Sequence, residues 1–172
     1  MQNTSDRLAC LGLALGATLG LAGSLVGAAT SRGVLWGIDG AGLVMAASLL
    51  AVKYLRQGKD ITAAGFLVFA IGEGIIMSSA ASPLDQSGPA FAGGTALWAT
   101  GLLLVSAQRE FPLPVRILGT LAALLFAATS LMILSGTALT PLTQPLPFFA
   151  YPVFVLTLVG WIWTLWSRRA TV

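Results

Sequence analysis

Six apolar runs alternate with short polar segments along the whole chain. Each run is about 20 residues long, enough for an α-helix that rises 1.5 Å per residue to cross a hydrocarbon core of ~30 Å. We therefore predict an all-α fold: a bundle of six transmembrane helices with short loops, forming a single integral membrane domain over residues 1–172. The predicted spans cover residues 8–29, 34–55, 61–80, 90–107, 115–135 and 148–167.

The composition agrees with this pattern. The chain is 56% hydrophobic and 9% charged, whereas soluble domains are about 25% charged. So few charges could not solvate the surface of a soluble fold, so the lipid bilayer is the predicted environment. The net charge of +3 does not indicate a nucleic-acid partner, because the basic residues lie in short loops, where they orient the helices.

The basic residues divide unequally between the two predicted faces. Arg32 is the single base on one face, and the other eight lie on the opposite face: Arg7, Lys53, Arg56, Lys59, Arg109, Arg116, Arg168 and Arg169. Bases gather on the cytoplasmic side, so we expect both termini in the cytoplasm, in a membrane of the bacterial inner (plasma) type. A cleaved signal peptide is the alternative for the first run, but the run exceeds the usual ~7–15 apolar residues.

Small residues recur at every fourth position of the first run: Gly12, Gly16, Gly20, Ser24 and Ala28. This spacing puts them on one helix face, where another backbone can approach closely. We predict helix packing there, and also at Gly72 and Gly74 in the third run. The alternative is coincidence in a chain that has 20 glycines.

The third run contains Glu73 between these two glycines, and the second run contains Asp39 near its start. Ionisable residues at membrane depth are costly and are candidates for function. Asp39 is expected about five residues, or ~8 Å, below the face that carries Arg32, and Glu73 ~10 Å below it. Because consecutive helices are usually neighbours, the two carboxyl groups could face each other, and Arg32 could pair with Asp39.

A structural role for the same acids stays open. Glu73 could be a neutral carboxyl group bonded to a neighbouring helix, and Asp39 could reach interfacial water. If Glu73 is functional, we expect it to face the bundle interior and to bind a proton or a cation, because an unpaired buried anion is costly.

Other chemistry has little support in the sequence. Histidine is absent and Cys10 is the single cysteine, so histidine-based catalytic triads and metal sites are excluded. We find no phosphate-binding loop and no nucleophile motif, and we predict no catalytic residues, no metal and no cofactor. A membrane enzyme that uses carboxylates for acid–base work is the least favoured of the function classes.

Two function classes remain. The first is a small transporter or channel-like protein linked to a proton or cation through Glu73, Asp39 and Arg32. The second is a non-catalytic membrane scaffold or subunit that packs with a second copy or another membrane protein through glycine-rich helix faces. A transporter requires a polar cavity that reaches Glu73 from at least one face, whereas a scaffold would have Glu73 sealed by packing and a stripe of small residues left exposed for a partner.

Overall fold

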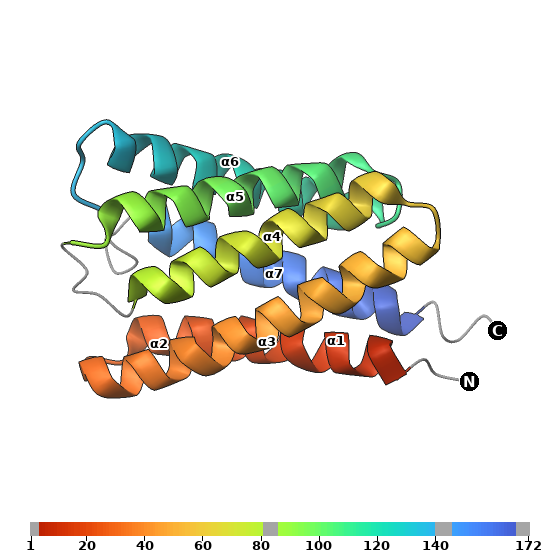
Figure 1. Ribbon diagram of the computed structural model, residues 1–172, viewed down its shortest axis with the longest axis horizontal. Helices are drawn as coiled ribbons and strands as arrows, with labels where there is room; N and C mark the ends of the chain where they lie inside the picture. Colours follow the sequence, from red (N-terminus) through yellow and green to blue (C-terminus); the bar gives the residue numbers. More distant parts are fainter. Residues whose placement is uncertain (1–3, 81–85, 140–145, 168–172) are drawn as a thin grey trace.

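The computed structural model describes residues 4–80, 86–139 and 146–167 of the chain, and they are helical with short connections. Figure 1 shows the helices lying side by side along one long axis. Their bounds are α1 (Thr4–Leu15), η1 (Gly16–Gly20), α2 (Leu21–Leu25), α3 (Ala29–Arg56), α4 (Asp60–Ala80), α5 (Gly88–Ala107), α6 (Leu113–Leu134) and α7 (Leu146–Ser167).

Six helical stretches are long and apolar enough to cross a membrane, and the first combines α1, η1 and α2 over Thr4–Leu25. This confirms the predicted fold class and indicates an integral membrane protein. Most helix ends fall within about two residues of the predicted spans, as expected for boundaries that fray.

The first connection differs from the prediction. We expected residues 30–32 to link the first two spans, but they belong to α3, and the chain turns at residues 26–28 instead. Val26 and Ala28 have extended backbone angles there. A turn made of apolar residues does not interrupt the hydropathy pattern, whereas the polar residues that follow it do, so the pattern placed the turn too late.

The first span also contains a π-helical turn, η1, which hydropathy does not reveal because it keeps the chain helical. Single π-turns of this kind are frequent at functional sites.

Each span packs on the next in chain order, and α1 also contacts α7, so the six spans form a closed ring. Large aromatic side chains from α4, α5 and α7 fill its interior. Trp161 of α7, for example, has its ring 5.0 Å from that of Phe66 and 6.4 Å from that of Phe69, both on α4.

Paired glycines bring α4 and α5 together. A Cβ on Gly72 would lie 2.9 Å from the Gly94 carbonyl oxygen, and one on Gly101 would lie 2.7 Å from that of Gly65. Such close backbone approach gives dispersion contacts that lipid cannot replace. The prediction included Gly72 but missed its partners, because a sequence does not show which faces of two helices meet.

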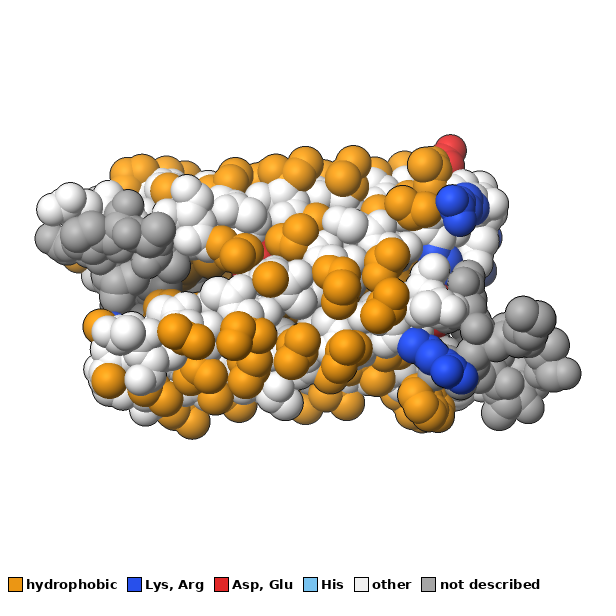
Figure 2. All heavy atoms as spheres, turned by 60° about the horizontal axis from the view of Figure 1, so that its bottom comes forward, with side chains coloured by type: hydrophobic (Ala, Val, Ile, Leu, Met, Phe, Trp, Pro, Cys, Tyr) orange, Lys and Arg blue, Asp and Glu red, His pale blue; other side chains and the backbone are white. Residues whose placement is uncertain are grey.

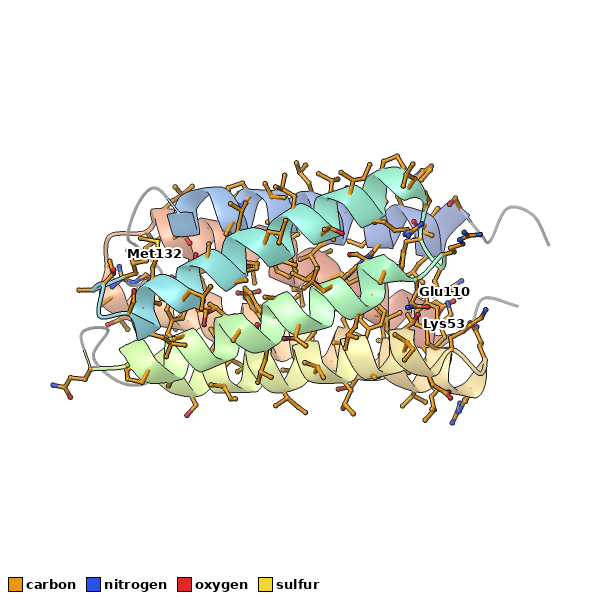
Figure 3. The ribbon with its side chains drawn as sticks, turned by 90° about the horizontal axis from the view of Figure 1, so that it is seen from above. Lys53, Glu110 and Met132 are labelled. Atoms are coloured by element: carbon orange, nitrogen blue, oxygen red, sulfur yellow. The ribbon has the colours of Figure 1, made fainter. Side chains whose placement is uncertain are left out.

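Charged side chains gather at one end of the ring, which we call the basic end, while apolar side chains cover the length of the molecule (Figure 2). Figure 3 places Lys53 and Glu110 at this end and Met132 at the other. Two ion pairs connect elements here: Lys53 with Asp6 at 2.9 Å, and Lys59 with Glu110 at 3.1 Å. The apolar length and charged end are typical of a protein whose solvent is a bilayer.

Candidate functional site

Asp39 and Glu73 lie inside the ring on neighbouring helices. Asp39 is on α3 and is 6% exposed, while Glu73 is on α4 and is 2% exposed. The two carboxyl groups are close enough to interact electrostatically. The structure therefore brings together the two acids that the sequence singled out.

Asp39 lies further along its helix than the predicted span implied. Because α3 begins at Ala29 rather than at residue 34, Asp39 is ten residues, or ~15 Å, from the start of its helix. Its side chain is buried among the helices rather than open to the outside of the bundle.

Glycines make room for these side chains. A Cβ on Gly40 would lie 2.7 Å from Glu73 Oε1, and one on Gly20 would lie 2.7 Å from Asp39 Oδ2 and in contact with the Tyr151 hydroxyl. Any side chain at either position would push the acids or the phenol aside. The positions of the two acids therefore depend on Gly40, which follows Asp39 on α3, and on Gly20 of η1.

Tyr151 of α7 joins the acids from across the ring. Its hydroxyl donates to the Gly16 carbonyl oxygen at 3.0 Å and lies 3.5 Å from Asp39 Oδ2. It also interacts electrostatically with both Asp39 and Glu73. The sequence analysis missed Tyr151, because only contact between the last and first spans brings it here. Its position, in the second turn of α7, is one where a tyrosine is ordinarily read as an interfacial residue.

Trp98 of α5 forms the side of the site next to Glu73. Its Cδ1 atom would be 3.1 Å from a Cβ on Gly72, and the indole interacts with the Glu73 carboxyl group. The contact is not aligned as a hydrogen bond, since Trp98 Nε1 and Glu73 Oε2 both lack a hydrogen-bond partner. Asp39 Oδ1 lacks one as well. Buried polar atoms are rarely left without a partner, so these three mark the site as unusual.

Arg32 is not part of this cluster. Its guanidinium donates to the Val26 carbonyl oxygen at 3.3 Å and lies 5.6 Å from the centre of the Trp36 ring. Arg32 precedes Asp39 by seven residues, which is two helical turns or ~10 Å, and its side chain extends toward the end of the bundle. Among the described residues no base is paired with either buried acid.

The residues predicted to pack the first span have different surroundings. A Cβ on Gly12 would meet the Gly42 backbone and Ala46, and a Cβ on Gly16 would meet Leu43, all on α3. Gly20 faces the acid site, whereas Ser24 and Ala28 are exposed. The contact with α3 passes instead to Gly23, which is buried and faces Trp36.

Gly72 and Gly74 also differ from each other. Gly72 packs against α5, but a Cβ on Gly74 would have no heavy atom within 4 Å. Residues two apart on a helix point to nearly opposite sides, so only one of them can face the neighbouring helix.

The described residues hold no group of three or more Cys, Asp or Glu side chains that could bind a metal. Two acids, a phenol and an indole remain, and the Tyr151 hydroxyl is a donor that lies near a carboxyl oxygen, 3.5 Å from Asp39 Oδ2. An ionised carboxylate here would need a counter-charge. No described base supplies it, so a proton or a cation from outside the chain would have to.

No protein-family model, curated protein or solved structure matches this chain.

Proposed function

We propose that the protein is a small transporter or channel-like protein that binds a proton or small cation at the Asp39–Glu73 pair and exchanges it across one membrane face. One observation carries the proposal: two acids from neighbouring helices are buried together, each has an oxygen without a hydrogen-bond partner, and no described base neutralises them. Intramembrane acids of this kind mark ion pathways and proton relays in other membrane proteins.

Ion flux in reconstituted vesicles tests this proposal. Purified protein in liposomes that hold a pH-sensitive dye should move protons when a potassium gradient with valinomycin sets a membrane potential. Glu73→Gln and Asp39→Asn keep the size of each side chain but cannot titrate, so each should abolish the flux. Asp60→Asn, which alters an exposed acid at the start of α4, should leave it unchanged.

A sodium gradient imposed across the same vesicles separates the two candidate ions. Flux driven by sodium and lost in Glu73→Gln would assign the site to a metal cation. Absence of any flux in the wild type, or equal flux in all three variants, would contradict the proposal.

We further propose that the basic end faces the cytoplasm of a bacterial-type inner membrane, with both chain termini on that side. The bundle supports this orientation because α1 begins and α7 ends at the same end as the α3–α4 connection (Figure 1). Reporter fusions after Gly58 and Ser87 should then read inside and outside, respectively. The reverse result would overturn the orientation.

A second candidate function is self-association, which is favoured by the small residues on the outer face of α3. Gly12, Gly16 and Gly20 of the first span are used within the ring, but α3 has small residues that stay exposed: Gly33, Gly37, Ala41 and Ser48. A Cβ on Gly33 or Gly37 would have no heavy atom within 4 Å. Small residues four apart on an exposed face allow two membrane helices to pack, which favours a scaffold or a dimer of the transporter.

The oligomeric state tests the second candidate. In nanodiscs, cross-linking of single cysteines at Ala41 in a Cys10→Ser background should trap a dimer, and Gly37→Leu should abolish it. Gly93→Leu is the matched control, because Gly93 on α5 is equally open. A monomeric wild type would remove this candidate without affecting the ion site.

A further inference from the structure

The π-helical turn η1 is held by side chains from other helices. Tyr151 of α7 donates to the Gly16 carbonyl oxygen at 3.0 Å, and the Trp36 indole of α3 donates to that of Gly20 at 3.3 Å. These bonds lie at the first and last residues of the turn. A π-turn interrupts the regular α-helical hydrogen-bond pattern. Hydrogen bonds from other helices to its carbonyl oxygens therefore help to stabilise it.

The Tyr151 hydroxyl lies between two acceptors. It has one proton to donate, and the Gly16 carbonyl oxygen at 3.0 Å competes for it with Asp39 Oδ2 at 3.5 Å. The first distance is typical of a hydrogen bond and the second is at the outer limit. In this structure the proton therefore goes mainly to Gly16.

The charge of Asp39 decides this competition. Hydrogen bonds to an ionised acceptor are roughly twice as strong as those between neutral groups. An ionised Asp39 would therefore draw the hydroxyl away from Gly16, whereas a protonated Asp39 leaves it there. The absent Cβ of Gly20 makes the movement feasible, because the hydroxyl and Asp39 Oδ2 share that space.

We propose that Tyr151 couples the proton occupancy of Asp39 to the π-turn, so that the first span changes conformation when the site gains or loses a proton. This inference rests on the proposed function in requiring that the acid pair exchanges protons. It adds that η1 is the element that responds, so that proton occupancy of Asp39 opens or closes the site through the first span.

Few charged or titratable groups bear on this switch. Tyr151 interacts electrostatically with Asp39 from α3 and Glu73 from α4. On the α5 side the neighbouring ring is Trp98, 6.3 Å away between centroids, and η1 contains no ionisable residue. Arg32 is engaged with Val26 and Trp36.

Two measurements on one sample test the inference. The full-length protein in nanodiscs is titrated from acid to alkaline pH. The part of the infrared carbonyl band of protonated carboxyl groups that is missing from the Asp39→Asn and Glu73→Gln variants reports the two buried acids. Amide hydrogen exchange over Gly16–Gly20, corrected for the intrinsic effect of pH, reports the π-turn. Exchange should rise about threefold or more as the carboxyl band disappears, the effect of losing one ordinary hydrogen bond.

Tyr151→Phe removes the hydroxyl and keeps the ring. The carboxyl band should still titrate, but exchange over Gly16–Gly20 should become independent of pH. Tyr54→Phe, which alters the other tyrosine of the chain, should behave like the wild type. Gly20→Ala is a second variant: its Cβ displaces the hydroxyl and should also uncouple the two signals.

The outcomes separate the two proposals. A wild-type carboxyl band that does not change with pH would overturn the proposed proton exchange itself. A band that titrates while exchange over Gly16–Gly20 stays constant would overturn only the coupling. So would a Tyr151→Phe variant in which both signals still change together.

Discussion

The two halves of the bundle core are built from different chemistry. Toward the basic end, four rings from α3, α4, the α5–α6 connection and α7 fill the interior: Tyr54, Phe66, Phe111 and Trp161, each no more than 4% exposed. Their centroids lie 5.0–6.3 Å apart, a range typical of favourable aromatic pairs. The other half holds Asp39 and Glu73 with Tyr151 and Trp98. We call these the aromatic half and the acidic half.

The acids of the molecule show what this difference means. Near the basic end, Asp6 and Glu110 are paired with lysines at the rim. The side chains of the two acids are 18% and 17% exposed, so they keep some contact with solvent. In the acidic half the two carboxyl groups have no basic partner among the described residues. The first arrangement ties helices together, while the second is costly unless an ion is bound. We therefore expect substitutions in the aromatic half to affect stability most, and the proposed ion site lies in the acidic half.

The largest expected effect is on the aromatic half. Trp161→Ala should lower the free energy of unfolding by about 3–5 kcal/mol, because it leaves a large cavity among packed rings. The measurement is an SDS titration in mixed micelles. Trp163→Ala on the same helix is the control, since Trp163 is 59% exposed, and should cost no more than about 0.5 kcal/mol. Equal losses would show that the aromatic half has no special role in stability.

The glycines on either side of Glu73 should respond in opposite directions. Gly72→Ala should lose about 1–3 kcal/mol, because the new Cβ is forced against the backbone of α5. Gly74→Ala should gain about 0.5–1 kcal/mol, because alanine favours the helix and nothing obstructs it. Thermal unfolding in detergent compares the two variants. A loss at both positions would mean that Gly74 also packs against a helix.

Substitutions of Glu73 should show whether its carboxyl group raises or lowers the free energy of unfolding. Glu73→Leu should raise stability by about 1 kcal/mol, because it removes a buried polar group whose Oε2 lacks a hydrogen-bond partner, and such burial is costly. Glu73→Gln should remain close to the wild type. The same SDS titration measures both. A loss of about 1–3 kcal/mol in Glu73→Leu would instead indicate that the carboxyl group satisfies a hydrogen-bond partner and is structural.

The smallest effect is expected at the rim. Asp6→Asn removes the ion pair with Lys53 and should cost less than about 1 kcal/mol. The cost should shrink further at high salt, which screens exposed charges. Unfolding at low and high ionic strength measures the difference. A large loss that does not depend on salt would place this pair with the buried groups rather than at the surface.

The sequence alone determined the fold class and two of the site residues. Apolar runs of membrane length and a low charge content require helices in lipid, because a bilayer offers no partner for an unpaired backbone. Glu73 and Asp39 are conspicuous for the same reason, since carboxyl groups within such runs are costly. These inferences depend on the environment of each residue along its own helix, which hydropathy describes well.

Only the tertiary structure decided which residues meet. Contact between α7 and the first span brings Tyr151 to Asp39, and the packing of α4 on α5 pairs Gly72 with Gly94 and seats Trp98 beside Glu73. The early start of α3 puts Asp39 ten residues into its helix, and η1 is not visible in the composition. Apolar helices attract one another with little chemical distinction, so the choice of faces depends on shape complementarity, which is a property of the folded bundle.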